Sequence, residues 1–167
     1  CATAAVPGSA RTTLVDFEGD FDLSRLEART VHARLVPADG GRALRLDAGH
    51  TEEWPGITLE PETGTWDVSG FQNILMDVEN PTSRPVSVGL RVDNPGGDGS
   101  KNCVQVIEEV PPGEQRTIKA PVSRTPWVFP KDVELVGMRG APGQTMIEPD
   151  NIVRIIVFVP RPSEDHS

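Results

Sequence analysis

The chain has 167 residues, of which 25 are Asp or Glu and 16 are Lys or Arg, so its formal net charge is −9. With no basic cluster to offset it, this charge argues against nucleic acid as a partner, because phosphates would repel the chain. Gly and Pro number 16 each. Such a composition argues against a helical bundle and is typical of one domain built from many short strands and turns.

Residues 1–10 form a small, uncharged segment that we expect to be a flexible tether. A mature bacterial lipoprotein begins with a lipidated cysteine and a tether of this kind, so Cys1 is a candidate lipidation site. A chain boundary that happens to fall on a cysteine is the alternative. We therefore expect an extracellular or cell-surface protein, whose only membrane contact is a lipid on Cys1. No apolar run approaches the roughly 20 residues that span a bilayer.

Short runs of period-2 alternation, separated by Pro, Gly, Asn and Asp, recur along the rest of the chain. They predict strands at residues 13–18, 30–36, 42–47, 57–59, 74–79, 86–93, 103–110, 116–120 and 152–159. The last run is apolar on both faces except at Arg154, which favours a strand in the middle of a sheet or one that is covered on both sides. Short helical turns are expected at residues 22–28, with Asp22 as N-cap, and at residues 130–136.

These elements predict an all-β, two-sheet antiparallel β-sandwich, a jelly roll of the galactose-binding-like type. We place the sandwich domain at residues 11–160. The polar residues 161–167 are expected to begin a linker towards a C-terminal catalytic domain.

No catalytic motif is present: the sequence lacks HExxH, GxSxG, CxxC and a phosphate-binding glycine loop. Glu108 and Glu109 are adjacent in a predicted strand, so they point to opposite faces and do not form a glycosidase pair. Structural Ca²⁺ is a candidate cofactor at Asp16 and Glu18, near Asp20, or around Asp93, Asn94, Asp98 and Asn102. Ordinary turn residues are the alternative for both groups. Cys103 is expected to be a small buried hydrophobic residue.

Sugar binding needs an aromatic face and a few planar polar side chains. Trp54 lies in a polar, turn-rich loop and is the best candidate for an exposed aromatic residue; a tryptophan folded over the sandwich edge is the alternative. Trp66 is expected in the core, and Trp127 is ambiguous. If the strands on either side of residues 94–101 pair, Arg91, Asn94 and Asn102 lie near one polar strip with Asp93 and Gln105. An ordinary solvated sheet face is the alternative.

Several segments, taken in order, resemble the module that precedes the barrel of family-50-type β-agarases. They are the Trp-Pro-Gly of residues 54–56 and the segments 66–69, 77–81, 90–96, 112–118 and 137–140. The resemblance covers about residues 14–159. It implies a jelly-roll sandwich, a galactan context such as agarose, and a catalytic barrel that this chain lacks. We add Arg139, which lies in the last of these segments, to the candidate sugar-binding residues, together with Trp127.

The function expected from these features is that of a non-catalytic carbohydrate-binding module, which binds agarose or a related galactan beside a catalytic domain in cis. Two alternatives are a structural or docking sandwich without sugar binding, and an independent jelly-roll lyase or hydrolase.

Overall fold

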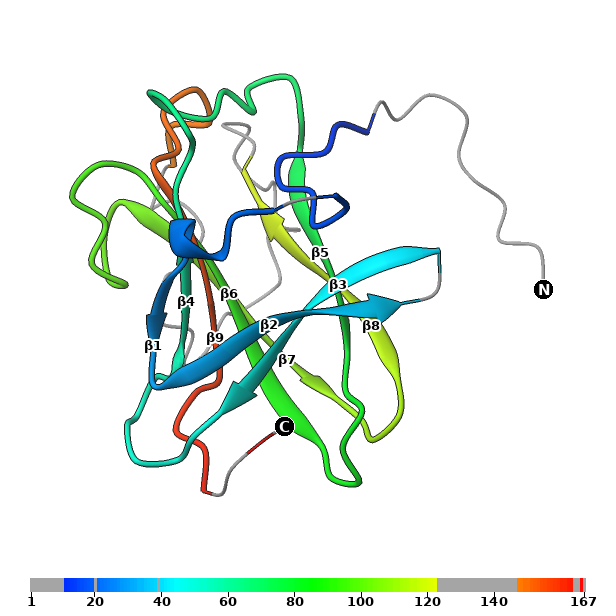
Figure 1. The fold of residues 1–167 in the computed structure, drawn as a ribbon. Helices are drawn as coiled ribbons and strands as arrows, with labels where there is room; N and C mark the ends of the chain where they lie inside the picture. Colours follow the sequence, from blue (N-terminus) through cyan, green and yellow to red (C-terminus); the bar gives the residue numbers. More distant parts are fainter. Residues whose placement is uncertain (1–10, 20, 39, 123–146, 164–165, 167) are drawn as a thin grey trace, which may run out of the picture.

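The structure, a computed structural model, describes residues 11–19, 21–38, 40–122, 147–163 and 166. These residues form nine strands and one short 3₁₀ helix (Figure 1). The elements are η1 (Leu23–Arg25), β1 (Glu27–Arg29), β2 (Val31–Ala38), β3 (Gly41–Ala48), β4 (Gly56–Leu59), β5 (Asn73–Glu79), β6 (Val86–Asp93), β7 (Cys103–Val110), β8 (Gln115–Pro121) and β9 (Arg154–Phe158).

All the described strand pairs are antiparallel. One sheet has five strands in the order β1-β4-β9-β6-β7, and two further pairs, β2-β3 and β5-β8, form two-stranded ribbons. In Figure 1, β1, β4 and β9 of the sheet lie on the left, β5 and β8 lie on the right, and the β2-β3 ribbon runs across the view. The predicted all-β sandwich of antiparallel strands is confirmed.

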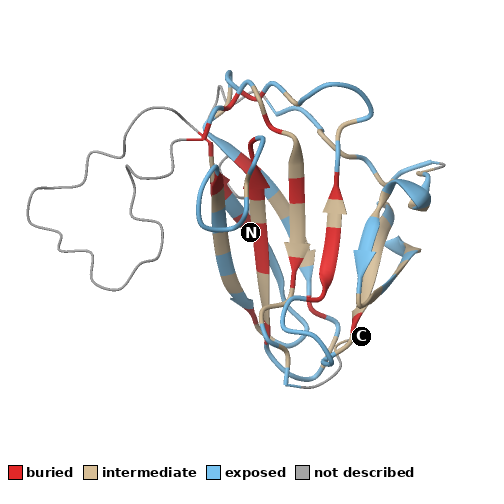
Figure 2. Ribbon diagram, turned by 90° about the vertical axis from the view of Figure 1, so that its left-hand side faces the viewer, coloured by how far each residue is buried: buried red, intermediate tan, exposed pale blue. Residues whose placement is uncertain are grey.

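The core lies between the five-stranded sheet and the ribbons because every second side chain of each strand points inward. Leu90, Val92 and Ile155 come from the sheet, and Ile74 and Ile118 come from the β5-β8 ribbon. Figure 2 shows buried residues concentrated on these strands, whereas most of the loops at the two ends are exposed. The β2-β3 ribbon contributes only partly buried side chains to this cluster, Val31, Leu44 and Leu46.

The last strand lies in the middle of its sheet, as predicted, because β9 pairs with β4 on one side and with β6 on the other. Ile155 packs into the core, while the neighbouring Ile156 lies on the opposite face, in register with Arg91 and Thr58.

The predicted strand at residues 13–18 is wrong, since this segment has no strand partner. The carboxylate of Asp16 instead accepts a hydrogen bond from the backbone N–H of Glu18 at 2.8 Å, and such local bonds compete with strand pairing. The carboxylate of Glu18 accepts the backbone N–H of Arg42 at the start of β3. The first alternating run therefore closes a turn against the β2-β3 ribbon.

The turn predicted at residues 22–28 is shorter than expected. Asp22 caps it by accepting the Ser24 N–H at 2.9 Å, but the helix ends at Arg25 and the chain continues into β1. All three residues of β1 are exposed and polar or small, so alternation could not reveal this strand. The turn predicted at residues 130–136 lies outside the described residues, as do Cys1 and the tether.

Candidate functional site

The solvent-facing side of the five-stranded sheet, called here the outer face, collects the polar residues that the sequence singled out. Strand register aligns Gln105, Arg91, Ile156 and Thr58 in one row across β7, β6, β9 and β4. A second row holds Ile107, Gly89, Phe158 and Gly56, and a third holds Cys103, Asp93 and Arg154.

A buried ion cluster lies at one end of this face. Asp93 is fully buried, and its carboxylate accepts two hydrogen bonds from Arg91, both of 2.8 Å. Arg154 approaches the same carboxylate at 3.2 Å and also donates to the carbonyl of Gly97 at 2.9 Å. Two cations therefore surround one anion, which is the condition under which a buried carboxylate is tolerated. This pairing leaves no place for Ca²⁺ at Asp93.

The hairpin between β6 and β7 folds back over the ion cluster. The predicted pairing of these strands is confirmed, with Asp93 opposite Cys103. A Cβ atom at Gly97 would lie 2.7 Å from the Asp93 side chain, so the loop needs glycine to approach so closely. Asn102 is exposed in the left-handed region, with φ of 52°, and its side chain donates to the carbonyl of Pro95 at 3.2 Å.

Asn94 has a structural role in this geometry. Its side chain is buried and donates to the carbonyls of Glu148 and Asn151 at 2.8 and 2.7 Å, and it accepts the Glu148 N–H at 2.6 Å. These three bonds occupy both N–H groups and the oxygen of the Asn94 side-chain amide. Asn94 thus holds the segment before β9 against the hairpin, and its amide is not available to a ligand on the outer face.

The carboxylate of Asp98 stabilises the tip of the same hairpin. It accepts hydrogen bonds from the hydroxyl and backbone N–H of Ser100 and from the N–H of Lys101, at 2.7, 2.9 and 3.0 Å. These donors, the Ser100 side chain first among them, lower the pKa of Asp98 to about 2. An ionised carboxylate that accepts hydrogen bonds from several backbone N–H groups stabilises a turn, and this is the role of Asp98 here.

Trp54 is 38% exposed and lies at the other end of the outer face. Its ring meets Phe158 edge-on, with centroids 5.5 Å apart, and the Arg161 guanidinium lies 5.6 Å from the centroid of its ring. Phe158 pairs with Gly89, which is four residues from Asp93 along β6, or about 13 Å. Trp54 is thus exposed as predicted and packs on the last residue of the central strand β9, but it is not next to Arg91, Asn94 or Asn102.

The remaining predicted aromatic and basic residues divide into two groups. Trp66 is partly buried and packs against the core, and its backbone bridges to Ile152, as expected. Trp127 and Arg139 lie outside the described residues.

Sequence reasoning missed the apolar residues of the outer face. Ile107 is 45% exposed between Gln105 and Glu109, and Phe158 lies flat enough on β6 that a Cβ atom at Gly89 would meet its ring at 2.2 Å. The sequence did contain a signal for this exposed apolar residue, because Ile107 lies on the same face of β7 as the polar Gln105 and Glu109.

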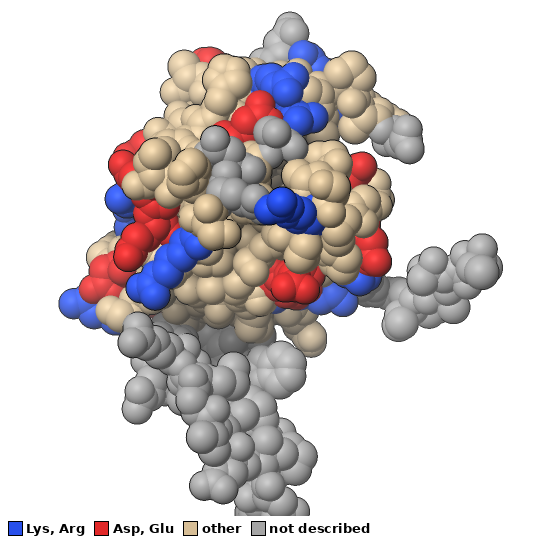
Figure 3. Space-filling model, turned by 90° about the horizontal axis from the view of Figure 1, so that it is seen from below, with Lys and Arg blue, Asp and Glu red and all other residues tan. Residues whose placement is uncertain are grey.

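Surface charge is mixed at the Trp54 end. Figure 3 shows acidic and basic side chains interspersed over the described surface seen from below. Arg29 pairs with Glu52 at 2.7 Å, and Arg161 lies 3.8 Å from Glu53. The visible face therefore offers no extended field of one sign to a highly charged ligand.

The two predicted calcium ligands near the N-terminus have local partners. Asp16 closes its own turn and Glu18 binds the backbone of β3, while Asp20 lies outside the described residues. No group of three or more His, Cys, Asp or Glu side chains suited to a metal occurs among the described residues.

Cys103 is buried, and burial raises the pKa of its thiol above the usual value, which makes it a poor nucleophile.

The fold is a β-sandwich similar to that of carbohydrate-binding modules. A family 11 carbohydrate-binding module from Clostridium thermocellum superposes with a TM-score of 0.57 at 17% identity, over 95% of this chain and 89% of that one. No family model matches the chain. The described part of the chain contains no helix long and apolar enough to cross a membrane.

The chain is also similar to part of several agarases. It is 27% identical over 114 residues to the Beta-agarase B of Vibrio sp. (strain JT0107), a match that covers 61% of this chain and 12% of that protein. The structure of an exo-beta-agarase superposes with a TM-score of 0.68 at 19% identity, over 90% of this chain and 22% of that one. The resemblance predicted from the sequence is therefore confirmed.

The chain thus spans a small part of the agarases that it matches, whereas 95% of it superposes on a family 11 carbohydrate-binding module. This partial coverage agrees with the prediction of an accessory domain.

Proposed function

We propose that this chain is a non-catalytic module that binds agarose or a related galactan and positions it for a glycoside hydrolase domain in cis. The similarity to part of several agarases supports the galactan context and the catalytic partner. A structure of the family 11 module holds a β-1,3-1,4-mixed-linked tetrasaccharide. This supports the idea that such a sandwich serves as a sugar-binding scaffold.

The observation that carries the proposal is the mixed character of the outer face. It presents Ile107 in the row next to Gln105 and Arg91, and Trp54 towards the other end of the same face, and both apolar side chains are more than a third exposed. Sugar rings have apolar C–H faces that pack on such side chains, and hydroxyl groups that planar amides and guanidiniums bind. Millimolar to micromolar affinity requires only about −4 to −8 kcal/mol, which a few such contacts supply.

Affinity electrophoresis in gels that contain agarose tests this surface. We expect the wild-type chain to be retarded, and Trp54→Ala and Gln105→Ala to migrate faster than wild type in these gels alone. Leu75→Ala is a matched control because Leu75 is 43% exposed on β5, in the ribbon that faces the other side. Wild-type migration unaffected by agarose would refute the proposal. Loss of retardation in Leu75→Ala would show that agarose binds the β5-β8 ribbon and not the outer face.

A docking module without its own sugar binding is the second candidate. The exposed Leu75 favours it, since a neighbouring domain would cover an apolar side chain of this kind. In the parent enzyme, Leu75→Ala would then lower the thermal midpoint by more than it does in the isolated module. An equal fall in the thermal midpoint of both proteins would show that Leu75 does not contact a neighbouring domain.

The proposal includes an extracellular or cell-surface location, because galactan gels are outside the cell, with a lipid on Cys1 as the anchor. Metabolic labelling of the full-length protein with a radioactive fatty acid would detect this lipid. Labelling that persists in a Cys1→Ser variant would exclude Cys1 as its site.

A further inference from the structure

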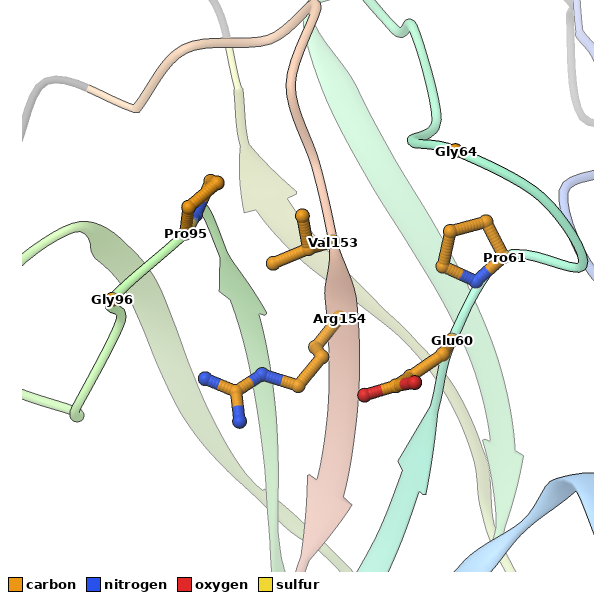
Figure 4. Close-up of a pocket in the computed structure, with 7 residues that line it drawn as sticks. All are labelled: Glu60, Pro61, Gly64, Pro95, Gly96, Val153 and Arg154. Carbon is orange, nitrogen blue, oxygen red and sulfur yellow. The ribbon is translucent and has the colours of Figure 1, made fainter.

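A hollow lies over the start of β9, between the loops that follow β4 and β6. Its volume is about 350 Å³, and it is lined by Glu60, Pro61, Gly64, Pro95, Gly96, Val153 and Arg154. Figure 4 shows Pro61 and Pro95 on opposite sides, with Val153 and Arg154 between them. Sites for small organic ligands begin at about 300 Å³, so this hollow suits a short segment of a glycan.

Arg154 is held rigidly as one wall of the hollow. Its Nη2 group lies 3.2 Å from the buried Asp93 carboxylate and donates to the Gly97 carbonyl. The structure describes no protein acceptor for its Nε or Nη1 groups, and a third of the side chain is exposed. Its remaining donors are therefore oriented in advance, which reduces the entropy lost when a ligand binds.

Glu60 faces Arg154 from the end of β4. Figure 4 shows its carboxylate directed towards the Arg154 side chain, yet no ion pair or hydrogen bond to Glu60 occurs among the described residues. The side chain is exposed, so the carboxylate is free to accept hydrogen bonds from a ligand. The hollow thus offers fixed donors on Arg154 and a free acceptor on Glu60, with Pro61 and Pro95 on its two outer sides.

The glycines keep this space open. Gly64 and Gly96 have positive φ angles of 63° and 75°, a conformation that glycine adopts without strain. A Cβ atom at Gly64 would meet nothing within 4 Å, and one at Gly96 would meet only the Asn102 amide at 3.5 Å. No side chain enters the hollow from either position.

The charges of this region cancel. Arg91 and Arg154 carry two positive charges, and Asp93 and Glu60 carry two negative charges. The buried Asp93 carboxylate offsets one of the two guanidinium charges, and the exposed Glu60 carboxylate offsets the other, so no net positive charge remains to attract an anion. A sulfate or carboxylate group on a sugar would meet this carboxylate and be repelled, whereas hydroxyl groups can both accept from Arg154 and donate to Glu60.

We propose that this hollow is a binding subsite for neutral sugar residues, in which Glu60 accepts and Arg154 donates hydrogen bonds to hydroxyl groups, and that it makes the module prefer uncharged over sulfated galactans. The inference rests on the proposed function and deepens it, because the hollow lies on the sheet that carries the outer face. Glu60 belongs to none of the three rows of the outer face, so its role in sugar binding is additional to theirs.

Isothermal titration of the whole chain with neutral agarose oligosaccharides and with a sulfated galactan, carrageenan, tests the subsite. A hydrogen bond to a charged group contributes about 1.5–3 kcal/mol, so Glu60→Gln should weaken binding of the neutral oligosaccharide about tenfold. The same variant should narrow the preference over carrageenan, since it removes the repelling charge. Glu62→Gln is the matched control: Glu62 is exposed nearby but pairs with Arg25 at 2.7 Å, and its affinity should equal that of wild type.

The outcomes separate this inference from the proposed function. Wild type that binds neither galactan overturns both. Wild type that binds agarose in a Trp54-dependent manner, with unchanged affinity in Glu60→Gln and Glu60→Ala, overturns only the subsite. Tighter binding of carrageenan than of agarose by wild type also overturns it. Circular dichroism of each variant confirms folding, which an exposed side chain at position 60 should not disturb.

Discussion

Gly89→Ala is expected to destabilise the sandwich through a single contact. Gly89 and Gly56 flank Phe158 on the outer face, and a Cβ atom at position 89 would lie 2.2 Å from the tip of the Phe158 ring. Ordinary contacts begin near 3.4 Å, so the ring would have to move by more than 1 Å. Phe158 is only 6% exposed and Trp54 packs against it, which leaves little room for this shift.

The cost follows from overpacking. Inserting a methyl group where side chains cannot move costs about 1–3 kcal/mol, and the better strand propensity of alanine offsets up to about 1 kcal/mol of that. We therefore expect a net loss of about 1–2 kcal/mol in the free energy of unfolding. Urea denaturation followed by circular dichroism measures this quantity from the midpoint and slope.

A second substitution identifies the cause. Phe158→Leu removes the part of the ring that would clash, so the double variant should lose less stability than the sum of the two single variants. Gly70→Ala is the control, because a methyl group added at Gly70 would meet no atom within 4 Å and the φ angle there is not positive. A Gly89→Ala midpoint equal to that of Gly70→Ala, or strictly additive effects with Phe158→Leu, would refute the reasoning.

Three further predictions concern the hairpin end. Asp93→Asn should cost about 3 kcal/mol of unfolding free energy in urea denaturation, because it leaves two guanidiniums around a buried neutral amide; a loss below 1 kcal/mol would argue against a paired charge there. Asn94→Ala should speed hydrogen exchange of the Glu148 amide, which loses its acceptor, while the amide of Ile118 in β8 stays protected. The carboxyl carbon of Asp98 should titrate by NMR near pH 2. Since its folded pKa is depressed, its contribution to stability is complete above the usual carboxyl pKa and is lost as the pH falls towards 2. Ser100→Ala should move the midpoint upward, and an unchanged midpoint would show that this hydroxyl is not the main cause.

Alternation made most of the sandwich predictable. Strands β2 to β9 were expected within a few residues of their observed bounds, because each has one face in the core and the period of two survives in the sequence. The central place of β9 followed from its two apolar faces. Residues 13–18 have the same alternation but no partner strand, and β1 has a partner but no alternation. Pairing depends on the partner, which a single segment cannot reveal.

The candidate site was predictable in its strands and not in its contacts. Arg91 and Asn102 were placed correctly at the β6-β7 hairpin, since pairing across a loop follows from chain order. That Asn94 turns inward depends on the Glu148–Asn151 segment, which lies more than fifty residues away in the sequence. Glu60 becomes a candidate only when β9 lies between the loops of β4 and β6, a juxtaposition created by the fold.

The position of β9 also bears on how the chain is made. Its five residues fill the gap between β4 and β6. During translation, both β4 and β6 leave the ribosome well before β9, the strand that joins them. Until then each presents an unpaired backbone edge, of the kind that recruits other chains. Because most of the sheet must close across such distances, the module is expected to fold only after release of the segment that ends at Phe158, and nascent chains arrested before it should depend on chaperones to stay unaggregated.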